Sequence, residues 1–157
     1  MHNNKVNALC YLGRYEEALI CYDKALELNP NNANVYNNKG VTLSALGRYK
    51  EALIFYDKAL EFNPNDVTAY NNKGNALFNL GRYKEALIFY DKALEFNPND
   101  VTAYNNKGVI LSVLGRYEEA LICYNKALEL IPNDVNIHNN RAIILEKLDK
   151  QKNYKVY

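Results

Sequence analysis

The residue types that most often carry chemistry do not form a catalytic set in this 157-residue chain. Its two histidines, His2 and His138, lie near opposite ends of the sequence and are expected to serve in packing. Its three cysteines, Cys10, Cys21 and Cys123, form no C-x-x-C pair, so they predict free thiols and neither a metal knuckle nor a redox pair. We therefore predict no enzyme activity, no metal site and no cofactor.

Charged residues recur regularly and nearly cancel. Aspartates at 23, 57 and 91 are spaced evenly, which is typical of a solvated helix face rather than of an acid–base pair. Nineteen basic and eighteen acidic residues give no basic excess, which argues against nucleic-acid binding. No apolar run is long enough to cross a membrane. The first residues lack the apolar core of a signal peptide, so we expect a cytoplasmic protein.

Asparagine is the residue with the most suggestive placement. The chain has 25 asparagines, and adjacent pairs recur every 34 residues. Asparagine is a mediocre helix former, about 0.6 kcal/mol worse than alanine, so this fixed placement needs a reason. A side-chain amide offers two donors and two acceptor lone pairs, which suits a peptide group. The pairs are Asn3/Asn4, Asn37/Asn38, Asn71/Asn72, Asn105/Asn106 and Asn139/Asn140.

The elements that carry these pairs repeat with a period of 34 residues. All four prolines and all seven glycines follow this period, and residues 46–74 recur unchanged as residues 80–108. Such self-similarity is the signature of a helix-turn-helix solenoid. Asn32, Asp66, Asp100 and Asp134 are predicted N-caps of first helices of about thirteen residues. Glycine ends each first helix, and Asn-Pro or Ile-Pro follows each second helix, which predicts about nine helices and no strand.

The repeat resembles the tetratricopeptide repeat family. The marks of that family appear in order in residues 67–100, as Tyr70, Gly74, Leu77, Gly81, Tyr83, Ala86, Tyr90, Ala93 and Pro98. The resemblance implies an all-α, right-handed superhelical solenoid forming a single domain over residues 1–157. Its repeats would be residues 1–32, 33–66, 67–100 and 101–134, followed by a partial repeat or capping helix over residues 135–157. It also implies that the first helices line a concave groove that binds an extended peptide or a partner helix.

The second asparagine of each pair matches the ladder asparagine in the groove of the O-linked N-acetylglucosamine transferase family, where amides bond a peptide backbone. The first-choice contacts are therefore Asn4, Asn38, Asn72, Asn106 and Asn140. The alternative is that these asparagines bond one another or neighbouring carbonyls. Further along the same helix faces, polar and apolar side chains alternate from one first helix to the next. The polar step consists of Asn71, Asn75 and Asn79, and the apolar step of Val109 and Val113.

The clamp that grips the C-terminal carboxylates of heat-shock chaperones is not expected. Within the family this clamp needs Lys and Arg on successive first helices. The corresponding sites here hold Asn or Thr, for example Thr68, Asn72 and Thr102. Without a cation a carboxylate is not well held. A separate cationic row, Lys5, Lys39, Lys73, Lys107 and Arg141, is expected to cover apolar surface with its stems and to keep its charged heads in water.

The C-terminal end is expected to lack a cover. A helix over about residues 135–148 carries too many apolar residues for one buried stripe, and no apolar period follows it: Ile137, Ile143, Ile144, Leu145 and Leu148. We expect part of its surface to stay uncovered and to mediate self-association, as a homodimer or by end-to-end stacking, through Ile143, Ile144 and Leu148. The alternative is that Tyr154, Val156 and Tyr157 fold back as a cap. A second uncovered strip is predicted at Ile20, Ile54, Ile88 and Ile122.

Three functions follow from these patterns. The first is a non-enzymatic protein-interaction module or scaffold that binds a peptide or helix in the asparagine-lined groove. The second is a self-assembling element. The third is a recognition segment of a larger multidomain protein, which the incomplete first and last repeats favour.

Overall fold

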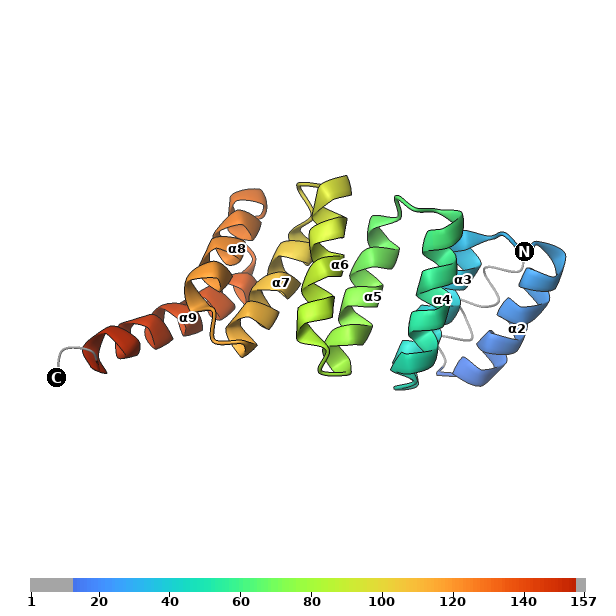
Figure 1. The fold of residues 1–157 in the computed structure, drawn as a ribbon, viewed down its shortest axis with the longest axis horizontal. Helices are drawn as coiled ribbons and strands as arrows, with labels where there is room; N and C mark the ends of the chain where they lie inside the picture. The colour runs from blue at the N-terminus through green and yellow to red at the C-terminus, as the bar shows by residue number, and fades with distance from the viewer. Residues whose placement is uncertain (1–12, 155–157) are drawn as a thin grey trace. The chain divides into compact units, whose positions relative to one another are not determined.

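The computed structural model describes residues 13–154, and this part of the chain consists of eight α-helices without a strand (Figure 1). The predicted first helices are α3 (Ala33–Ala45), α5 (Val67–Asn79), α7 (Val101–Val113) and α9 (Val135–Tyr154). The predicted second helices are α2 (Tyr15–Leu28), α4 (Tyr49–Phe62), α6 (Tyr83–Phe96) and α8 (Tyr117–Leu130). The all-α helical-repeat prediction is confirmed. The ninth predicted helix falls on residues 1–12, outside the described part.

Polar N-caps begin the first helices, as the sequence predicts. The side chain of Asn32 accepts a hydrogen bond from Val35 N at 3.2 Å, and that of Asp66 accepts one from Ala69 N at 3.0 Å. Each bond satisfies a backbone N–H that the helix itself leaves unpaired, which stabilises the helix by about 1 kcal/mol. The same bond is made by Asp100 and Asp134.

Glycines in the left-handed region end the first helices. The φ angles of Gly13, Gly47, Gly81 and Gly115 lie between 71° and 74°. In this conformation Gly47 N donates to Ser44 O at 3.0 Å, which satisfies a carbonyl of the last turn. A residue with a Cβ would be strained there, so the glycine row explains why the first helices stop where they do.

The chain divides into two compact units, the first extending to Arg82 and the second starting at Tyr83. The first unit contains α2 to α5, and α3 packs against α2 and α4, while α4 packs against α5. The second contains α6 to α9, and α7 and α8 pack together, with α6 against α7 and α9 against both α7 and α8. The single continuous domain expected from the sequence stays a prediction.

In each unit, the ring of a second-helix tyrosine packs directly against a first-helix glycine. A Cβ added at Gly40 would lie 2.6 Å from Tyr56 Cε1, and one at Gly108 would lie 2.7 Å from Tyr124 Cε1. The two tyrosines are almost completely buried. Burial raises the pKa of Tyr56 and of Tyr124 to about 12, so both stay neutral at physiological pH. Glycine at these two positions therefore lets the paired helices approach closely.

The C-terminal helix is longer than predicted. α9 has 20 residues and continues through residues 149–154, where the sequence suggested that the repeat pattern is lost. Asp149 occupies the position that glycine holds in the other repeats, so no left-handed residue ends the helix. Lys150 Nζ contacts Glu146 Oε1 at 2.7 Å, one turn earlier, and Lys152 lies in the last turn, where a cation suits the helix dipole.

Candidate peptide-binding face

On α3 and α5, the first member of each asparagine pair is more buried than the second. Asn37 and Asn71, the first members on α3 and α5, are buried, with 8% and 7% of their surface exposed. The second members range from partly buried to exposed: Asn38, Asn72, Asn106 and Asn140. Asn4 lies outside the described residues. On α9 the order is reversed, because Asn139 is exposed and Asn140 is partly buried, so the member that would meet a ligand stays a prediction.

Amides of neighbouring first helices bond to one another. In the first unit, Asn72 Nδ2 of α5 donates to Asn37 Oδ1 of α3 at 3.0 Å. In the second unit, Asn140 Nδ2 of α9 donates to Asn105 Oδ1 of α7 at 3.3 Å. This is the alternative that the sequence left open, and it gives part of each amide a structural role. An amide has a second N–H and a carbonyl oxygen as well, so one such bond does not exhaust its capacity for a peptide.

Asn106 has a different partner, the hydroxyl of Tyr90 on α6. Burial raises the pKa of Tyr90 well above its usual value, and the hydrogen bond with Asn106 partly offsets this rise. The amide row is therefore not uniform, because one member bonds a second helix and others bond the preceding first helix.

In the first unit, the face formed by α3 and α5 changes from apolar to polar. On α3 the exposed residues include Val41, which is 43% exposed. On α5 the equivalent steps are Asn75 and Asn79, both exposed. Asn79 Nδ2 donates to the backbone oxygen of Asn75 at 2.8 Å, so this amide is folded onto its own helix. Phe78, on the neighbouring side of α5, is partly buried.

In the second unit, the face formed by α7 and α9 is mainly apolar. Val109 is partly buried, and Val113 is 53% exposed. Ile143 on α9 is 52% exposed. Lys147 follows one turn later, and its Nζ lies 5.3 Å from the ring centroid of Tyr117. The residues predicted for the groove thus form two surfaces of different polarity, one in each unit.

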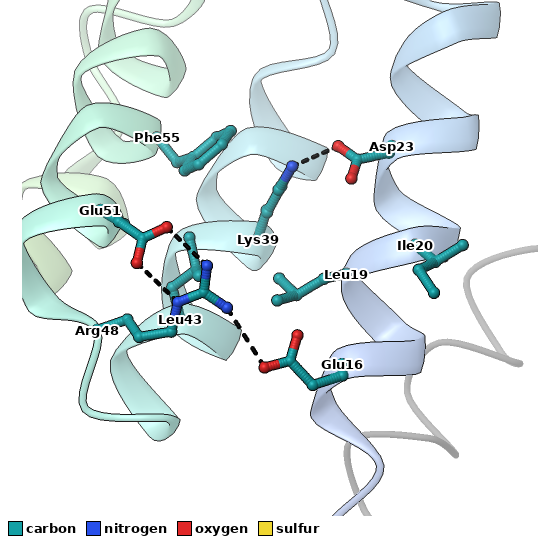
Figure 2. A pocket seen from close by; sticks show the side chains of 9 residues that line it. All are labelled: Glu16, Leu19, Ile20, Asp23, Lys39, Leu43, Arg48, Glu51 and Phe55. Atoms are coloured by element: carbon teal, nitrogen blue, oxygen red, sulfur yellow. Dashed lines mark hydrogen bonds and ion pairs between the residues drawn. The ribbon is translucent and has the colours of Figure 1, made fainter.

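The second-helix side of the first unit contains a hollow that the sequence did not predict. It lies between α2 and α4, with α3 behind them, and has a cavity volume of about 310 Å³ (Figure 2). Its apolar lining includes the buried Leu19 and Leu43. At its mouth, Arg48 contacts Glu51 at 2.6 Å and Glu16 at 3.3 Å. The Arg48 guanidinium lowers the pKa of Glu51 by hydrogen bonding.

The described members of the cationic row are bonded to neighbouring helices rather than free in water, so the expectation of solvated charged heads is wrong for them; Lys5 lies outside the described residues. The side chains of Lys39 and Lys73 are only 12% and 13% exposed, and each forms an ion pair. Every pair joins a first helix to the second helix before it, at a separation of sixteen residues. That spacing is a sequence signal that could have predicted the pairs. They are Lys39–Asp23, Lys73–Asp57, Lys107–Asp91 and Arg141–Asn125.

The surface expected to stay uncovered at the C-terminal end is not uncovered. Ile144 and Leu148 are 1% and 8% exposed, because this face of α9 packs against the preceding helices of the second unit. They belong to the core of the chain itself, and Ile143 is the one residue of the predicted self-association set that is exposed. The suggested cap by Tyr154, Val156 and Tyr157 lies outside the residues whose side chains are described.

His138 takes the structural place of a tyrosine. Tyr36 and Tyr70 donate from their hydroxyls to the carbonyl oxygens of Pro30 and Pro64, each at 2.9 Å. His138 Nε2 lies 2.7 Å from the equivalent oxygen of Pro132. A carbonyl only accepts, so Nε2 donates.

The described residues hold no grouping of three or more His, Cys, Asp or Glu side chains that could bind a metal ion. Among residues 13–154, no helix is both long enough and apolar enough to span a bilayer. The free cysteines of this part of the chain, Cys21 and Cys123, are partly buried and buried, and burial raises the pKa of the Cys123 thiol.

Models of the tetratricopeptide repeat match residues 1–65, 67–100, 101–134 and 123–154. No curated protein matches the chain. Among solved structures, MamA from Desulfovibrio magneticus RS-1 is similar with a TM-score of 0.85 at 26% identity, over 97% of this chain and 86% of that one.

Two other solved structures are described with peptides. YrrB, "a TPR protein with an unusual peptide-binding site", has a TM-score of 0.75 at 30% identity, over 94% of this chain and 76% of its own. The first TPR domain of Spaghetti (RPAP3), bound to the HSP90 peptide SRMEEVD, has a TM-score of 0.73 at 29% identity, over 74% of this chain and 93% of its own. The repeat models cover nearly the whole sequence, and this chain therefore belongs to the tetratricopeptide repeat family.

Proposed function

We propose that this chain is a protein-interaction module that binds an extended peptide or a partner helix along its first-helix face. The observation that carries the proposal is the exposure of apolar side chains beside amides on that face. Val41 in the first unit and Val113 and Ile143 in the second are 43%, 53% and 52% exposed. Contiguous exposed apolar area commonly marks an interface, and Val113 and Ile143 lie on helices α7 and α9, which pack together.

The similar structures support this class of function. YrrB is described with a peptide-binding site, and the RPAP3 domain is bound to a peptide. In this chain the amides of Asn38 and Asn75 would bond the ligand backbone, since both are exposed. The apolar residues of the second unit would receive apolar side chains of the ligand.

Selection from a displayed library of random peptides against the whole chain tests the proposal. For a selected peptide, the double change Asn38→Ala with Asn75→Ala should weaken binding, because each lost hydrogen bond costs roughly 0.5–1.5 kcal/mol. Val113→Ser should weaken it further by removing apolar contact. The matched control is Glu95→Ala, an exposed change on a second helix, which should leave the affinity unchanged. Unaltered affinity in both groove variants would refute the first-helix face as the binding surface.

The heat-shock peptide SRMEEVD serves as a specificity probe. The sites where a clamp would need cations hold Thr68, Asn72 and Thr102 in this chain. We therefore expect no saturation by this peptide at millimolar concentration in titration calorimetry. Tight binding would show that another part of the chain supplies the positive charge.

Self-association is a second candidate function, favoured by the exposed isoleucines of the second helices. These residues are between 53% and 61% exposed, as the sequence predicted: Ile20, Ile54, Ile88 and Ile122. Light scattering at increasing protein concentration tests it. If the strip mediates contact, Ile20→Glu with Ile54→Glu should yield a monomer of unchanged helical content.

A further inference from the structure

One face of α9 lies where a second helix would pack in a complete repeat. In complete repeats the leucines on this face, Leu43 of α3 and Leu111 of α7, are each 1% exposed. The equivalent residue of α9 is Leu145, which is 37% exposed. His138 and Ala142 share its side of the helix and are exposed as well. We call the surface formed by His138, Arg141, Ala142 and Leu145 the α9 seat.

Arg141 gives the α9 seat an uncompensated positive charge. In a complete repeat the equivalent cation Lys107 pairs with Asp91 on the preceding second helix at 2.5 Å. The pKa of Glu119 on the following second helix is lowered first by its hydrogen bond with Arg116 and also by the charge of Lys107, so Lys107 has two carboxylates nearby. Arg141 Nε bonds the neutral amide of Asn125 at 2.7 Å instead, and within the described residues no helix follows α9.

Arg141 stands where complete repeats have lysine, and its partner Asn125 stands where the other second helices have aspartate. The guanidinium of Arg141 can therefore bind a carboxylate from outside. Arg141 is partly buried, and among the described residues it forms no ion pair. A guanidinium presents five N–H donors in a planar fork, and only the Nε–H is used by Asn125. Its terminal nitrogens match the two oxygens of a carboxylate, which is the strong form of this contact.

Ala142 restricts what can occupy the α9 seat. In complete repeats this position is glycine, and a Cβ there would come 2.6 to 2.7 Å from the tyrosine of the second helix. An alanine therefore excludes a tyrosine at that point unless the helix moves outward. The second helices of this chain all carry tyrosine there, as Tyr22, Tyr56, Tyr90 and Tyr124. A second copy of this chain, inserted in the usual pose, would clash.

We propose that the α9 seat receives an amphipathic helix of a partner protein, held by a carboxylate on Arg141 and by aliphatic residues on Ala142 and Leu145. The complete repeats give the spacing that such a helix needs. There, Glu51 lies five residues before Tyr56, the residue that contacts the glycine. The partner helix would thus carry Glu followed five residues later by an aliphatic residue instead of tyrosine. This surface is separate from the proposed first-helix groove.

A labelled peptide with the 14-residue sequence of α4, but with leucine in place of its Tyr56 equivalent, is the probe. Fluorescence anisotropy with the whole chain should show that this peptide binds more tightly than the unchanged α4 sequence. Ala142→Gly should restore binding of the tyrosine peptide, because it removes the clashing Cβ. Arg141→Gln should lower the affinity for the leucine peptide roughly tenfold or more, which is the size of effect expected when a hydrogen bond to a charged group is lost. Replacing the peptide's equivalent of Glu51 by glutamine should have the same effect, with no further loss when this change is combined with Arg141→Gln.

Two matched variants separate this site from general effects on the fold. Lys147→Gln changes a cation on the groove side of α9 and should leave the peptide affinity unchanged. Asn125→Asp supplies Arg141 with an internal carboxylate and should remove the preference for a glutamate in the peptide. Both variants and Arg141→Gln are expected to keep the helical content of the parent in circular dichroism. Failure of the leucine peptide to bind, or an affinity that Arg141→Gln and Ala142→Gly both leave unaltered, would overturn the proposal. Either result leaves the groove proposal standing, because the groove variants are tested with different peptides.

Discussion

First and second helices of the same repeats differ in how much they vary. The second helices α4 and α6 have identical sequences over all 14 residues. The first helices α3 and α5 differ at seven of 13 positions. Three of the differing positions are exposed in both helices, namely Asn34/Thr68, Val41/Asn75 and Ala45/Asn79. The second helices α4 and α6, which supply Ala, Leu and Tyr to the core, are thus constant. The exposed positions of the first helices are where binding specificity can change.

The strongest test of this contrast is removal of a second-helix tyrosine. Tyr56 is 1% exposed and fills the space beside Gly40. Tyr56→Ala should lower the free energy of unfolding by about 3–5 kcal/mol, the cost of deleting a large buried aromatic ring. Urea denaturation followed by circular dichroism measures this. Ile54→Ala on the same helix, at a residue that is 56% exposed, is the control and should cost far less.

Overpacking at the first-helix side of the same contact should be the next largest effect. Gly40→Ala places a Cβ 2.6 Å from the Tyr56 ring, which has to move. We expect a loss of about 1–3 kcal/mol in the free energy of unfolding, despite the better helix propensity of alanine. A stability equal to that of the parent would mean that α3 and α4 can separate without cost. Gly108→Ala, against Tyr124 in the second unit, should behave in the same way.

The buried amides show that part of the first helices also serves the fold and is not free to vary for binding. Asn37→Ala removes the acceptor of the bond from Asn72 at a position that is only 8% exposed. The free energy of unfolding should fall by about 1–2 kcal/mol, since the partly buried amide of Asn72 loses its acceptor. Asn75→Ala on α5 is exposed and should have no cost or a small gain. Equal stabilities of the two variants in thermal melts would count against a structural role for the Asn37–Asn72 bond.

The ion pairs between layers should give the smallest effect. Asp23→Asn leaves Lys39 with a neutral partner, which reproduces the natural pair Arg141–Asn125. We expect a loss of about 1 kcal/mol or less at low salt, because Asp23 is 57% exposed. The difference from the parent should shrink as salt is added. A loss that is unchanged in 1 M salt would show that the contact is not mainly electrostatic.

The repeat signals in the sequence are sufficient to place most helix ends. Gly47 and Asp66 act through their own backbone or side chain, so their effect can be read locally. The end of α9 could not be placed in this way. The absence of an apolar period suggested a break, but loss of the apolar pattern does not by itself end a helix, and Asp149 supplies no glycine to end it.

The polar contacts of the candidate surfaces were harder to predict than the helices. The pair Lys39–Asp23 joins residues on different helices, so helical periodicity on either one does not reveal it. The burial of Ile144 depends on which face of α9 meets the preceding helices, and isoleucines on several faces left this open. For Ile144 the missing information was the rotation of α9 relative to its neighbours, whereas the Lys–Asp pairs could have been found from their constant sixteen-residue spacing.

The bonds between repeats have a constant separation along the chain, and this has a consequence for how the molecule can evolve. The amide bonds join residues 35 apart, and the cation pairs join residues 16 apart. Excising residues 67–100 would bring Lys107 sixteen positions after Asp57 and Asn106 thirty-five after Asn37, so each would meet an equivalent partner. Unequal recombination within the gene can therefore lengthen or shorten the array by whole repeats without stranding a buried polar group. The identical stretches 46–74 and 80–108 are what such a duplication leaves behind.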